Sequence, residues 1–274
     1  PRPRASGRSG ELLNGLPASW RSAAVAAARA ASAAILDLRD TTLQRQRKSD
    51  GSWVSAADHA ASRAITEHLA PLDASVPVIS EEGEHDPAGA TRFWLVDPLD
   101  GTREFLRGSE AFSVNIALIS DGYPCFGLIC LPTSATLYQG AAGFGAWRNG
   151  EPIHTARASQ NAPCRVLVSP GQTETLHAEL APRLATRGID TRIVAEPGAV
   201  KFCRLAQGDA DVYLRRTRTC GWDSAAGQAI LEAAGGAVYD AGWQRLCYVY
   251  HPHWYNGDFI AVADPVWRQR LAQG

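Results

Sequence analysis

One segment, residues 93–102, limits the folds open to this chain more than any other. The apolar run Phe93–Val96 predicts a buried strand. Asp97 and Asp100 follow it, on either side of Pro98 and Leu99. A proline at this point is expected to stop the strand and set a turn. Two carboxylates at the end of a buried strand repel each other unless a cation lies between them, so the segment indicates a site as well as a strand.

The next two residues, Gly101 and Thr102, extend the same interpretation. Glycine lets the backbone approach a ligand closely, and threonine can cap a following helix while offering a hydroxyl group. The amide groups at such a helix start are a docking place for phosphate. A segment of this kind standing alone is more often an Asp-rich turn with a side-chain cap. The rest of the chain must therefore decide between a turn and a site.

Composition excludes several classes of protein. The 274 residues carry a formal net charge of -1, which provides no field for binding a nucleic-acid polymer. The six cysteines are scattered, with neither a Cys-x-x-Cys pair nor clustered histidines, so neither structural zinc nor a disulfide framework is expected. No apolar run approaches the roughly 18 residues of a membrane span. These features predict a cytoplasmic enzyme with reduced cysteines.

The first residues of the chain differ in composition from the remainder. Residues 1–16 are expected to form a disordered extension, because the first ten are rich in Arg, Ser, Gly and Pro. No apolar stretch follows them, which argues against a secretory signal. A transit peptide remains the alternative.

The pattern between residues 17 and 154 predicts an α+β domain. Helices are expected over residues 17–38 and 55–69, the second with Ser55 as N-cap and Asp58 in its first turn. A short strand over residues 76–80 delivers Glu81 and Glu82 at its end. Three further strands, over residues 113–119, 125–131 and 136–140, are joined by short turns and predict an antiparallel meander.

The pattern changes after residue 154. Strands and helices alternate, which predicts an α/β domain over residues 155–274 that completes the active site. The strands are expected over residues 165–169, 191–195 and 210–214. The helices are expected over residues 173–186, 200–207 and 223–234, the last opening on Asp223.

Acidic residues recur where these expected elements begin or end. Each one alone is more often a solvated charge or a helix cap, but together they indicate a shared crevice. Carboxylate oxygens without His or Cys company suit magnesium or manganese rather than zinc. Two such ions can stabilise the attacking and leaving oxygens of phosphate-ester hydrolysis. The set is Asp50, Asp58, Glu81, Glu82, Asp97, Asp100 and Asp223.

Three motifs in register resemble those of the inositol monophosphatase superfamily, whose members are metal-dependent, lithium-sensitive phosphatases. They are Ile79–Glu82, Trp94–Thr102 and Trp222–Gly227. The resemblance implies an α/β fold: a layered αβαβα sandwich of the inositol monophosphatase and fructose-1,6-bisphosphatase type, with an antiparallel N-terminal sheet and a smaller mixed C-terminal sheet.

Three other features, Lys48–Asp50, Thr102–Phe105 and Lys201–Cys203, are similar to the CysQ-type branch of 3′(2′),5′-bisphosphate nucleotidases. That branch implies hydrolysis of adenosine 3′,5′-bisphosphate to AMP and phosphate. The alternatives are an inositol monophosphatase, a phosphatase of a sugar or biosynthetic intermediate, and a non-catalytic protein that binds a phosphorylated metabolite.

The resemblance also assigns roles residue by residue. It implies two or three Mg²⁺ ions, with Mn²⁺ as a substitute, acting on a small phosphorylated metabolite in a monomer or homodimer. The implied metal ligands are the side chains of Glu81, Asp97, Asp100 and Asp223 and the carbonyl of Leu99. Asp50, Thr102 and Asp58 would handle the attacking water, and Glu82 would hydrogen-bond ligands or water. Substrate would contact Gly101, Thr102, Lys201, Arg215 and Asp223.

Two departures from the family pattern and one run of arginines bear on the substrate. Trp53 stands where the family often has proline, and Pro197–Ala199 replaces Gly-Ser-Ser, which removes two hydroxyl groups near the expected nucleotide. Arg215, Arg216 and Arg218 lie just before Asp223 and are expected either to grip a second phosphate or to form a solvated basic edge.

Overall fold

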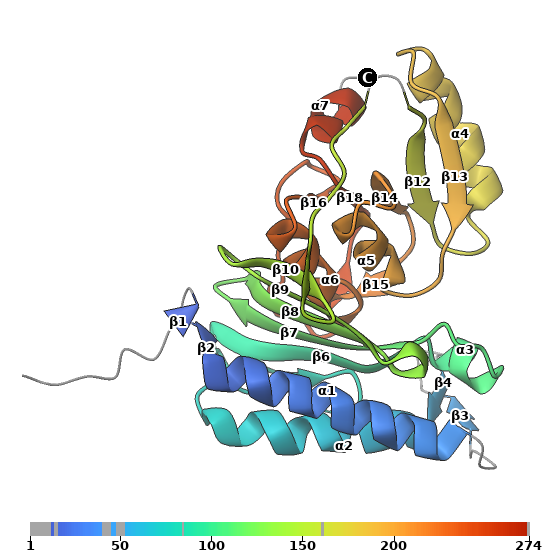
Figure 1. Cartoon of the computed structure of the whole chain (residues 1–274). Helices are drawn as coiled ribbons and strands as arrows, with labels where there is room; N and C mark the ends of the chain where they lie inside the picture. The colour runs from blue at the N-terminus through green and yellow to red at the C-terminus, as the bar shows by residue number, and fades with distance from the viewer. Residues whose placement is uncertain are drawn as a thin grey trace, which may run out of the picture.

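The chain folds into alternating layers of helices and sheets (Figure 1), here described from a computed structural model. The structure describes residues 12–13, 16–39, 45–47, 53–83, 85–159 and 162–272. Within the predicted N-terminal extension, Leu12–Leu13 (β1) pairs with Leu16–Pro17 (β2), and Leu16 is buried in the core. The end of that extension is therefore ordered, contrary to the expectation for residues 12–13 and 16.

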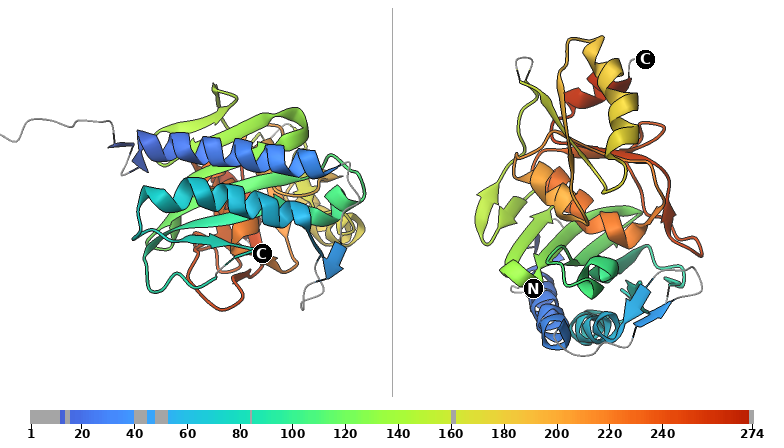
Figure 2. Two further views of the ribbon diagram at one scale, coloured as in Figure 1. Left: turned by 90° about the horizontal axis from the view of Figure 1, so that it is seen from below. Right: turned by 90° about the vertical axis from the view of Figure 1, so that its right-hand side faces the viewer.

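The helices agree closely with the sequence pattern. The two N-terminal helices lie side by side across one face of a sheet, as Figure 2 shows from below. The helices are α1 (Ala18–Arg39), α2 (Ala56–Leu69), α3 (Thr102–Leu106), α4 (Thr173–Ala185), α5 (Val200–Ala206), α6 (Gly221–Ala233) and α7 (Val266–Ala272). The last of these was not predicted, and α6 begins two residues before Asp223.

A seven-stranded sheet forms the middle of the N-terminal half. Its order is β11-β10-β9-β8-β7-β6-β5. The predicted meander is confirmed as β7–β8–β9, and every neighbouring pair is antiparallel except β5 and β6, which run parallel at one edge. The strands are β5 (Val78–Ser80), β6 (Arg92–Asp100), β7 (Ser113–Ser120), β8 (Tyr123–Leu131), β9 (Thr136–Ala141), β10 (Gly145–Arg148) and β11 (Glu151–Ile153).

A smaller mixed sheet forms the C-terminal half. Its order is β13-β12-β14-β18-β16, with parallel pairing at β12 and antiparallel pairing at β18. Its strands are β12 (Cys164–Val168), β13 (Thr191–Ala195), β14 (Val212–Arg215), β16 (Ala237–Asp240) and β18 (Phe259–Val262). Two short pairs complete the described strands: β3 (Arg45–Arg47) with β4 (Trp53–Ser55), and β15 (Thr219–Cys220) with β17 (Tyr255–Asn256).

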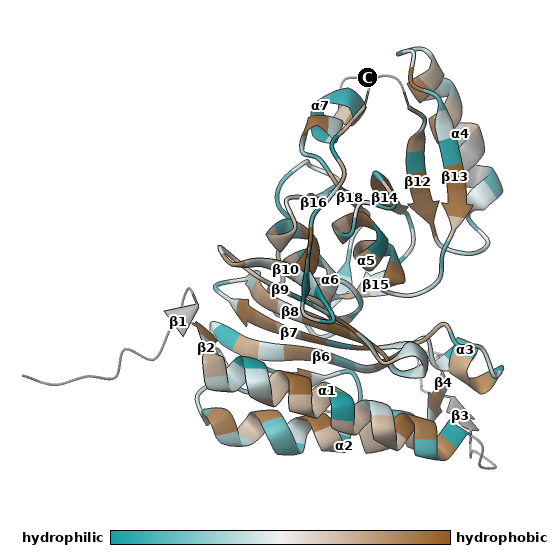
Figure 3. Ribbon diagram, in the orientation of Figure 1, coloured by the Kyte–Doolittle hydropathy of each residue, from teal (hydrophilic) through white to brown (hydrophobic). Residues whose placement is uncertain are grey.

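Three hydrophobic clusters separate the layers. One lies between α1, α2 and the large sheet, a second between the large sheet, α5, α6 and the small sheet, and a third between the small sheet, α4 and α7. In Figure 3, hydrophobic colour runs along much of the large sheet, whereas α1 and α2 alternate between hydrophobic and hydrophilic residues. The layers therefore follow the αβαβα order that the sequence predicts. The expected boundary near residue 155 lies between β11 and β12, and the independence of the two halves stays a prediction.

Helix α6 lies unusually close to the large sheet because two strand residues lack a side chain. A Cβ atom on Gly127 would come 2.3 Å from the Ala226 carbonyl oxygen. One on Gly140 would come 2.5 Å from the Ile230 Cα atom. The glycines thus let the helix backbone rest directly on β8 and β9. This contact fixes the start of α6, which carries Asp223, over the large sheet.

Candidate metal and phosphate site

Asp97 and Asp100 lie on the same face of the large sheet because β6 contains a bulge. In a regular strand, residues three positions apart point to opposite faces. Here Asp97 pairs with Asn115 and Asp100 with Ser113, so three steps along β6 match two along β7. The expectation that Pro98 ends the strand is therefore wrong. The bulge takes Pro98 out of the ladder, so the strand continues and both carboxylates face the site.

The acids from three elements act on one another electrostatically. Asp97 is 1% exposed, and burial raises the pKa of its carboxyl well above the usual range, helped by the charges of Glu81, Asp100 and Asp223. Burial, Asp100 and Glu81 together raise the pKa of Asp223 to about 7. These mutual effects show that the fold gathers the end of β5, the end of β6 and the start of α6. Such a cluster is stable only when a bound cation balances its negative charge or when some of its carboxyl groups are protonated.

Asn115 provides an independent sign that the cluster is built for a ligand. It lies opposite Asp97 in the ladder, so the two side chains share a face of the sheet. Its Oδ1 accepts a hydrogen bond of 2.9 Å from the hydroxyl of Ser113. Its Nδ2 is buried and has no partner in the part of the chain that the structure describes. A buried amide donor of this kind marks the place of a bound water or ligand oxygen.

Gly101 and Thr102 form the turn that follows the bulge. Gly101 has φ 92°, and a Cβ atom there would come 2.9 Å from the carbonyl oxygen of Ala111, so only glycine fits. Gly101, rather than Thr102, is the N-cap of α3, and the expected capping role of Thr102 is wrong. The Thr102 hydroxyl instead points back to the acids. It donates to Asp58 Oδ1 at 2.8 Å and to the Leu99 carbonyl at 3.2 Å.

Asp58 is placed by the start of α2, as the sequence predicts. Ser55 is the N-cap, and its amide and hydroxyl donate to Asp58 Oδ2 at 2.8 Å and 2.6 Å. This reciprocal capping box holds one carboxylate oxygen and leaves Oδ1 facing Thr102. Asp58 is 1% exposed, so the Thr102–Asp58 pair is a fixed unit beside the acid cluster.

Asp223 is aimed by a similar device at the start of α6. The amide of the N-cap residue Cys220 donates to Asp223 Oδ2 at 2.8 Å. The carboxylate therefore sits in the first turn, where the helix dipole favours negative charge. This geometry explains why α6 starts at Gly221: the predicted helix opener is its third residue, folded back onto the cap.

A buried tryptophan ties the segments that carry Glu81 and Asp223. Trp254 donates from its indole nitrogen to the carbonyl of His85 at 2.8 Å, and its own carbonyl accepts from the amide of Gly221 at 2.7 Å. The ring of His85 lies 5.1 Å from that of Trp222, and a ring nitrogen of His85 lies 3.2 Å from the carbonyl oxygen of Glu81. Trp254 has φ 53°, which is rare for a bulky residue. No motif in the sequence indicates this link.

The segment Glu196–Ala199 of the C-terminal half rests on Asp100. The amide of Ala199 donates to Asp100 Oδ2 at 2.7 Å. Lys201 is buried, and its ammonium donates to the carbonyls of Glu196 at 2.9 Å and Gly198 at 2.7 Å. Burial lowers the pKa of Lys201 to about 8. Lys201 therefore holds this segment against the acid site with two of its three N–H groups.

A cavity of about 490 Å³ opens beside these groups. It brings together five of the predicted site residues: Asp100, Gly101, Lys201, Arg215 and Asp223. Arg103, Glu104 and Arg107 of α3 and the loop after it also line the cavity, and the sequence reasoning did not assign them to the site. The sequence feature that could have indicated them is the i, i+4 spacing of Arg103 and Arg107, which begins directly after Thr102.

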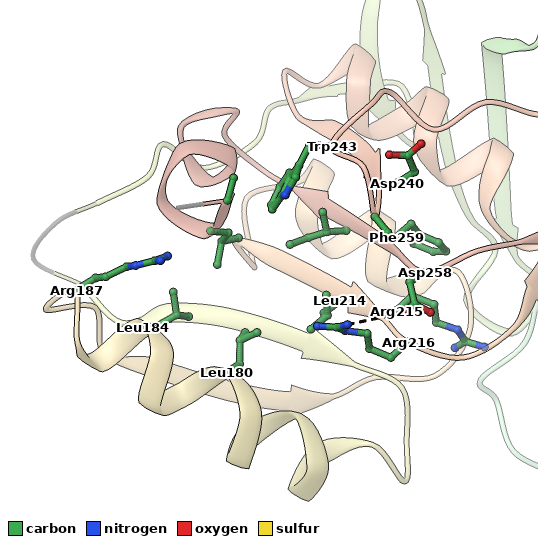
Figure 4. Close-up of a pocket in the computed structure, with 14 residues that line it drawn as sticks. Leu180, Leu184, Arg187, Leu214, Arg215, Arg216, Asp240, Trp243, Asp258 and Phe259 are labelled. Carbon is green, nitrogen blue, oxygen red and sulfur yellow. Dashed lines mark ion pairs between the residues drawn. The ribbon is translucent and has the colours of Figure 1, made fainter. Parts of the chain in front are cut away.

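The three arginines before Asp223 do not act as one cluster. Arg216 faces Asp258 at 3.7 Å, and Figure 4 marks this ion pair beside a separate pocket of about 220 Å³ that contains none of the clustered acids. Arg218 lies over the ring of Tyr255, 4.1 Å from its centroid. Arg215 alone lines the acid cavity, and it donates to Ser169 Oγ and, at 3.1 Å, to the Thr217 carbonyl. The expectation of a three-arginine grip is wrong for Arg216 and Arg218.

Several predicted residues have a more limited description. Lys48 and Asp50 lie outside the described residues. Leu99 packs its side chain into the core below the sheet, while its carbonyl accepts the Thr102 hydroxyl. Glu82 follows Glu81 at the same turn, and its role stays a prediction.

The donor chemistry of the site fits a hard divalent cation. Carboxylates that raise one another's pKa and a nearby backbone carbonyl are the oxygen ligands that Mg²⁺ prefers, and the amide Nδ2 of Asn115 can donate to a water bound beside them. As placed, no three His, Cys, Asp or Glu side chains among the described residues form a completed metal-binding group.

The comparisons with known proteins agree with this geometry. Residues 17–273 match the model of the inositol monophosphatase family. The chain belongs to this family. It is 38% identical over 233 residues to 3′(2′),5′-bisphosphate nucleotidase CysQ of Salmonella typhimurium, covering 82% of this chain and 91% of that protein.

Solved structures of the family share the fold. CysQ from Bacteroides thetaiotaomicron superposes with a TM-score of 0.75 at 31% identity, covering 88% of this chain and 96% of that one. The extragenic suppressor protein suhB from Bartonella henselae has a TM-score of 0.74 at 24% identity, covering 93% of this chain and 98% of that one. Within the described residues, no helix has the length and apolar character needed to cross a bilayer.

Proposed function

We propose that this protein is a magnesium-dependent phosphomonoesterase that removes the 3′-phosphate of adenosine 3′,5′-bisphosphate, producing AMP and phosphate. One observation carries the proposal: a buried acid cluster lies beside a fixed Thr102–Asp58 pair at the edge of a cavity. The names of the CysQ relatives support the choice of a bisphosphorylated nucleotide.

The proposed metal ligands are Glu81, Asp97, Asp100, Asp223 and the Leu99 carbonyl. Magnesium bound by these groups would lower the pKa of water and neutralise the phosphate. The number of ions, two or three, and the ability of Mn²⁺ to replace Mg²⁺ belong to the same proposal. The proposal is supported by the electrostatic interaction of four acids: the charges of Glu81, Asp100 and Asp223 raise the pKa of Asp97.

The chain's own groups then position the water and the phosphate. The Thr102 hydroxyl directs its one O–H at Asp58, with the Leu99 carbonyl as a second and more distant acceptor, so its lone pairs are open to accept a hydrogen bond from the attacking water. That arrangement orients a water oxygen for attack on phosphorus. As the new bond forms, the bond from phosphorus to the 3′ oxygen breaks, the Thr102–Asp58 pair accepts the proton that the water loses, and the departing 3′ oxygen takes a proton from solvent. The amides of Gly101 and Thr102 are placed to hold the phosphate oxygens.

The compartment is part of the proposal. The six cysteines, all within the described residues, are not joined by disulfides, which supports a reducing compartment such as the cytoplasm. A role for Asp50 beside Thr102 also belongs to the proposal.

Phosphate release tests the proposed function directly. We expect Mg²⁺-dependent turnover of adenosine 3′,5′-bisphosphate in preference to inositol 1-phosphate and fructose 1,6-bisphosphate. Preference for an inositol or sugar ester would overturn the nucleotidase assignment and keep the chemistry. A folded, Mg²⁺-loaded protein that releases phosphate from none of the three would contradict the enzymatic proposal.

A further inference from the structure

Two arginines that line the acid cavity have no partner among the residues that the structure describes. Arg103 lies in the first turn of α3 and Arg107 at its C-cap, one helical turn further on, and both are exposed and line the cavity. Neither guanidinium forms a hydrogen bond or ion pair with any residue that the structure describes. Like charges at i and i+4 repel each other. A bound dianion between them would remove that repulsion.

Two other cations that line the cavity, Lys201 and Arg215, already donate part of their N–H groups to the protein. Lys201 donates to two carbonyl groups, and Arg215 donates to Ser169 and Thr217. Both side chains therefore brace the C-terminal wall of the cavity. The donors of Arg103 and Arg107 remain available for a ligand.

The helix that carries the two arginines is firmly anchored. Phe105 is 3% exposed and packs edge-on against Phe112, with ring centroids 5.2 Å apart. Arg39 of α1 donates to the carbonyl of Gly108 at 3.1 Å and fixes the chain after α3. The backbone that carries the two arginines is therefore held in place.

The ligand must be a strong anion. Glu104 lines the same cavity and offsets part of the positive charge, so a weak or singly charged group gains little there. A phosphate dianion accepts paired hydrogen bonds from guanidinium forks. Gly101 and Thr102 form the start of the same helix next to Asp100, and with the metal site they would hold the phosphate that is cleaved.

We propose that Arg103 and Arg107 bind the second phosphate, the 5′-phosphate, of a bisphosphorylated nucleotide whose 3′-phosphate is at the acid cluster. This inference rests on the proposed function and adds to it the element that selects a bisphosphate over a monophosphate. It also replaces the sequence-based expectation that the arginines before Asp223 supply this grip.

The test compares two substrates that share the scissile 3′-phosphate. Adenosine 3′,5′-bisphosphate carries the second phosphate, and adenosine 3′-phosphate lacks it. The double variant Arg103→Gln, Arg107→Gln should lower the ratio of kcat/KM for the first over the second about 10- to 100-fold, as expected for lost hydrogen bonds to a charged group. Its kcat/KM for adenosine 3′-phosphate should stay within about threefold of the wild-type value.

A matched control separates a local subsite from general electrostatics. Arg192 is exposed on β13 and does not line the cavity, so Arg192→Gln removes the same charge elsewhere and should leave the ratio unchanged. An unchanged ratio in the double variant overturns the subsite. Equal losses on both substrates also overturn it, because the arginines then serve the scissile phosphate or the fold. A wild-type enzyme that does not favour the bisphosphate refutes the proposed function itself, and the subsite with it.

Discussion

Acidification should stabilise this protein when metal is removed, which is opposite to the usual behaviour of carboxylates. Burial, Asp100 and Glu81 raise the pKa of Asp223 to about 7. In the unfolded chain the same group has its ordinary pKa, so between the two values the folded state binds more protons than the unfolded state. Folding stability therefore falls as pH rises through this window. Asp97, whose pKa is also raised, acts in the same direction.

The size of the effect follows from the shift at Asp223. Between about pH 5 and about pH 7 the folded carboxyl keeps most of its proton and the unfolded one has lost it, which lowers the free energy of unfolding by about 2 kcal/mol. In a chain of this size that change corresponds to a Tm lower by about 4–8 °C at the higher pH. Bound Mg²⁺ replaces the protons as counter-charge, so the loss should disappear in its presence.

Thermal unfolding measured by fluorescence, in EDTA and in saturating Mg²⁺ over this pH range, provides the assay. Asp223→Asn is the matched variant, because it keeps the shape of the side chain and removes its charge. In EDTA this variant should show a flatter pH dependence than wild type and a higher Tm near pH 7. A wild-type Tm in EDTA that rises or stays constant from about pH 5 to about pH 7 would refute the reasoning. So would an increase in Tm on adding Mg²⁺ that is the same at about pH 5 as at about pH 7.

Two further predictions concern the roles within the site. Asp97→Asn should abolish both activity and Mg²⁺ binding, because Asp97 is central among the clustered acids. Thr102→Ala should instead slow turnover about 100-fold and leave Mg²⁺ binding intact, because the Thr102 hydroxyl positions the attacking water. Kinetics and calorimetry with Mg²⁺ check this contrast, and similar loss of Mg²⁺ binding in both variants would contradict it. Trp254→Phe should raise the Mg²⁺ concentration needed for half-maximal activity about 10-fold, because the indole bond to His85 braces the Glu81 segment. Trp243→Phe is its control, and a lower Tm with unchanged Mg²⁺ dependence would reduce Trp254 to a core residue.

Much of the fold could be predicted because its elements have strong local signals. The helix beginning at Ala56 has its cap and capping box within four residues, Ser55 to Asp58, so its start is encoded locally. The meander β7–β9 alternates short apolar strands with tight turns, which specifies its pairing. The edge strand β5 runs parallel to β6, a pairing that depends on distant residues and carries no local signal.

The bulge in β6 shows where local rules mislead. Proline lacks an amide donor, and its usual effect is to end a strand. Here Asp100 still pairs with Ser113, because β7 continues alongside and two unpaired residues, Pro98 and Leu99, absorb the mismatch. Whether β6 continues past Pro98 therefore depends on its pairing with β7.

By itself, the sequence determined the chemistry available to this protein: the acids at the ends of elements, the Gly-Thr turn and the membership of an acid-rich, hard-metal class of site. Only the tertiary structure decided which of these groups act together. It joined Thr102 to Asp58 across 44 positions, engaged Lys201 and Arg215 with the protein, and left Arg103 and Arg107 open to the cavity. The physical reason is that residue type sets what a side chain can donate, accept or ionise, whereas burial and its neighbours set whether those capacities are used inside the protein or remain for a ligand.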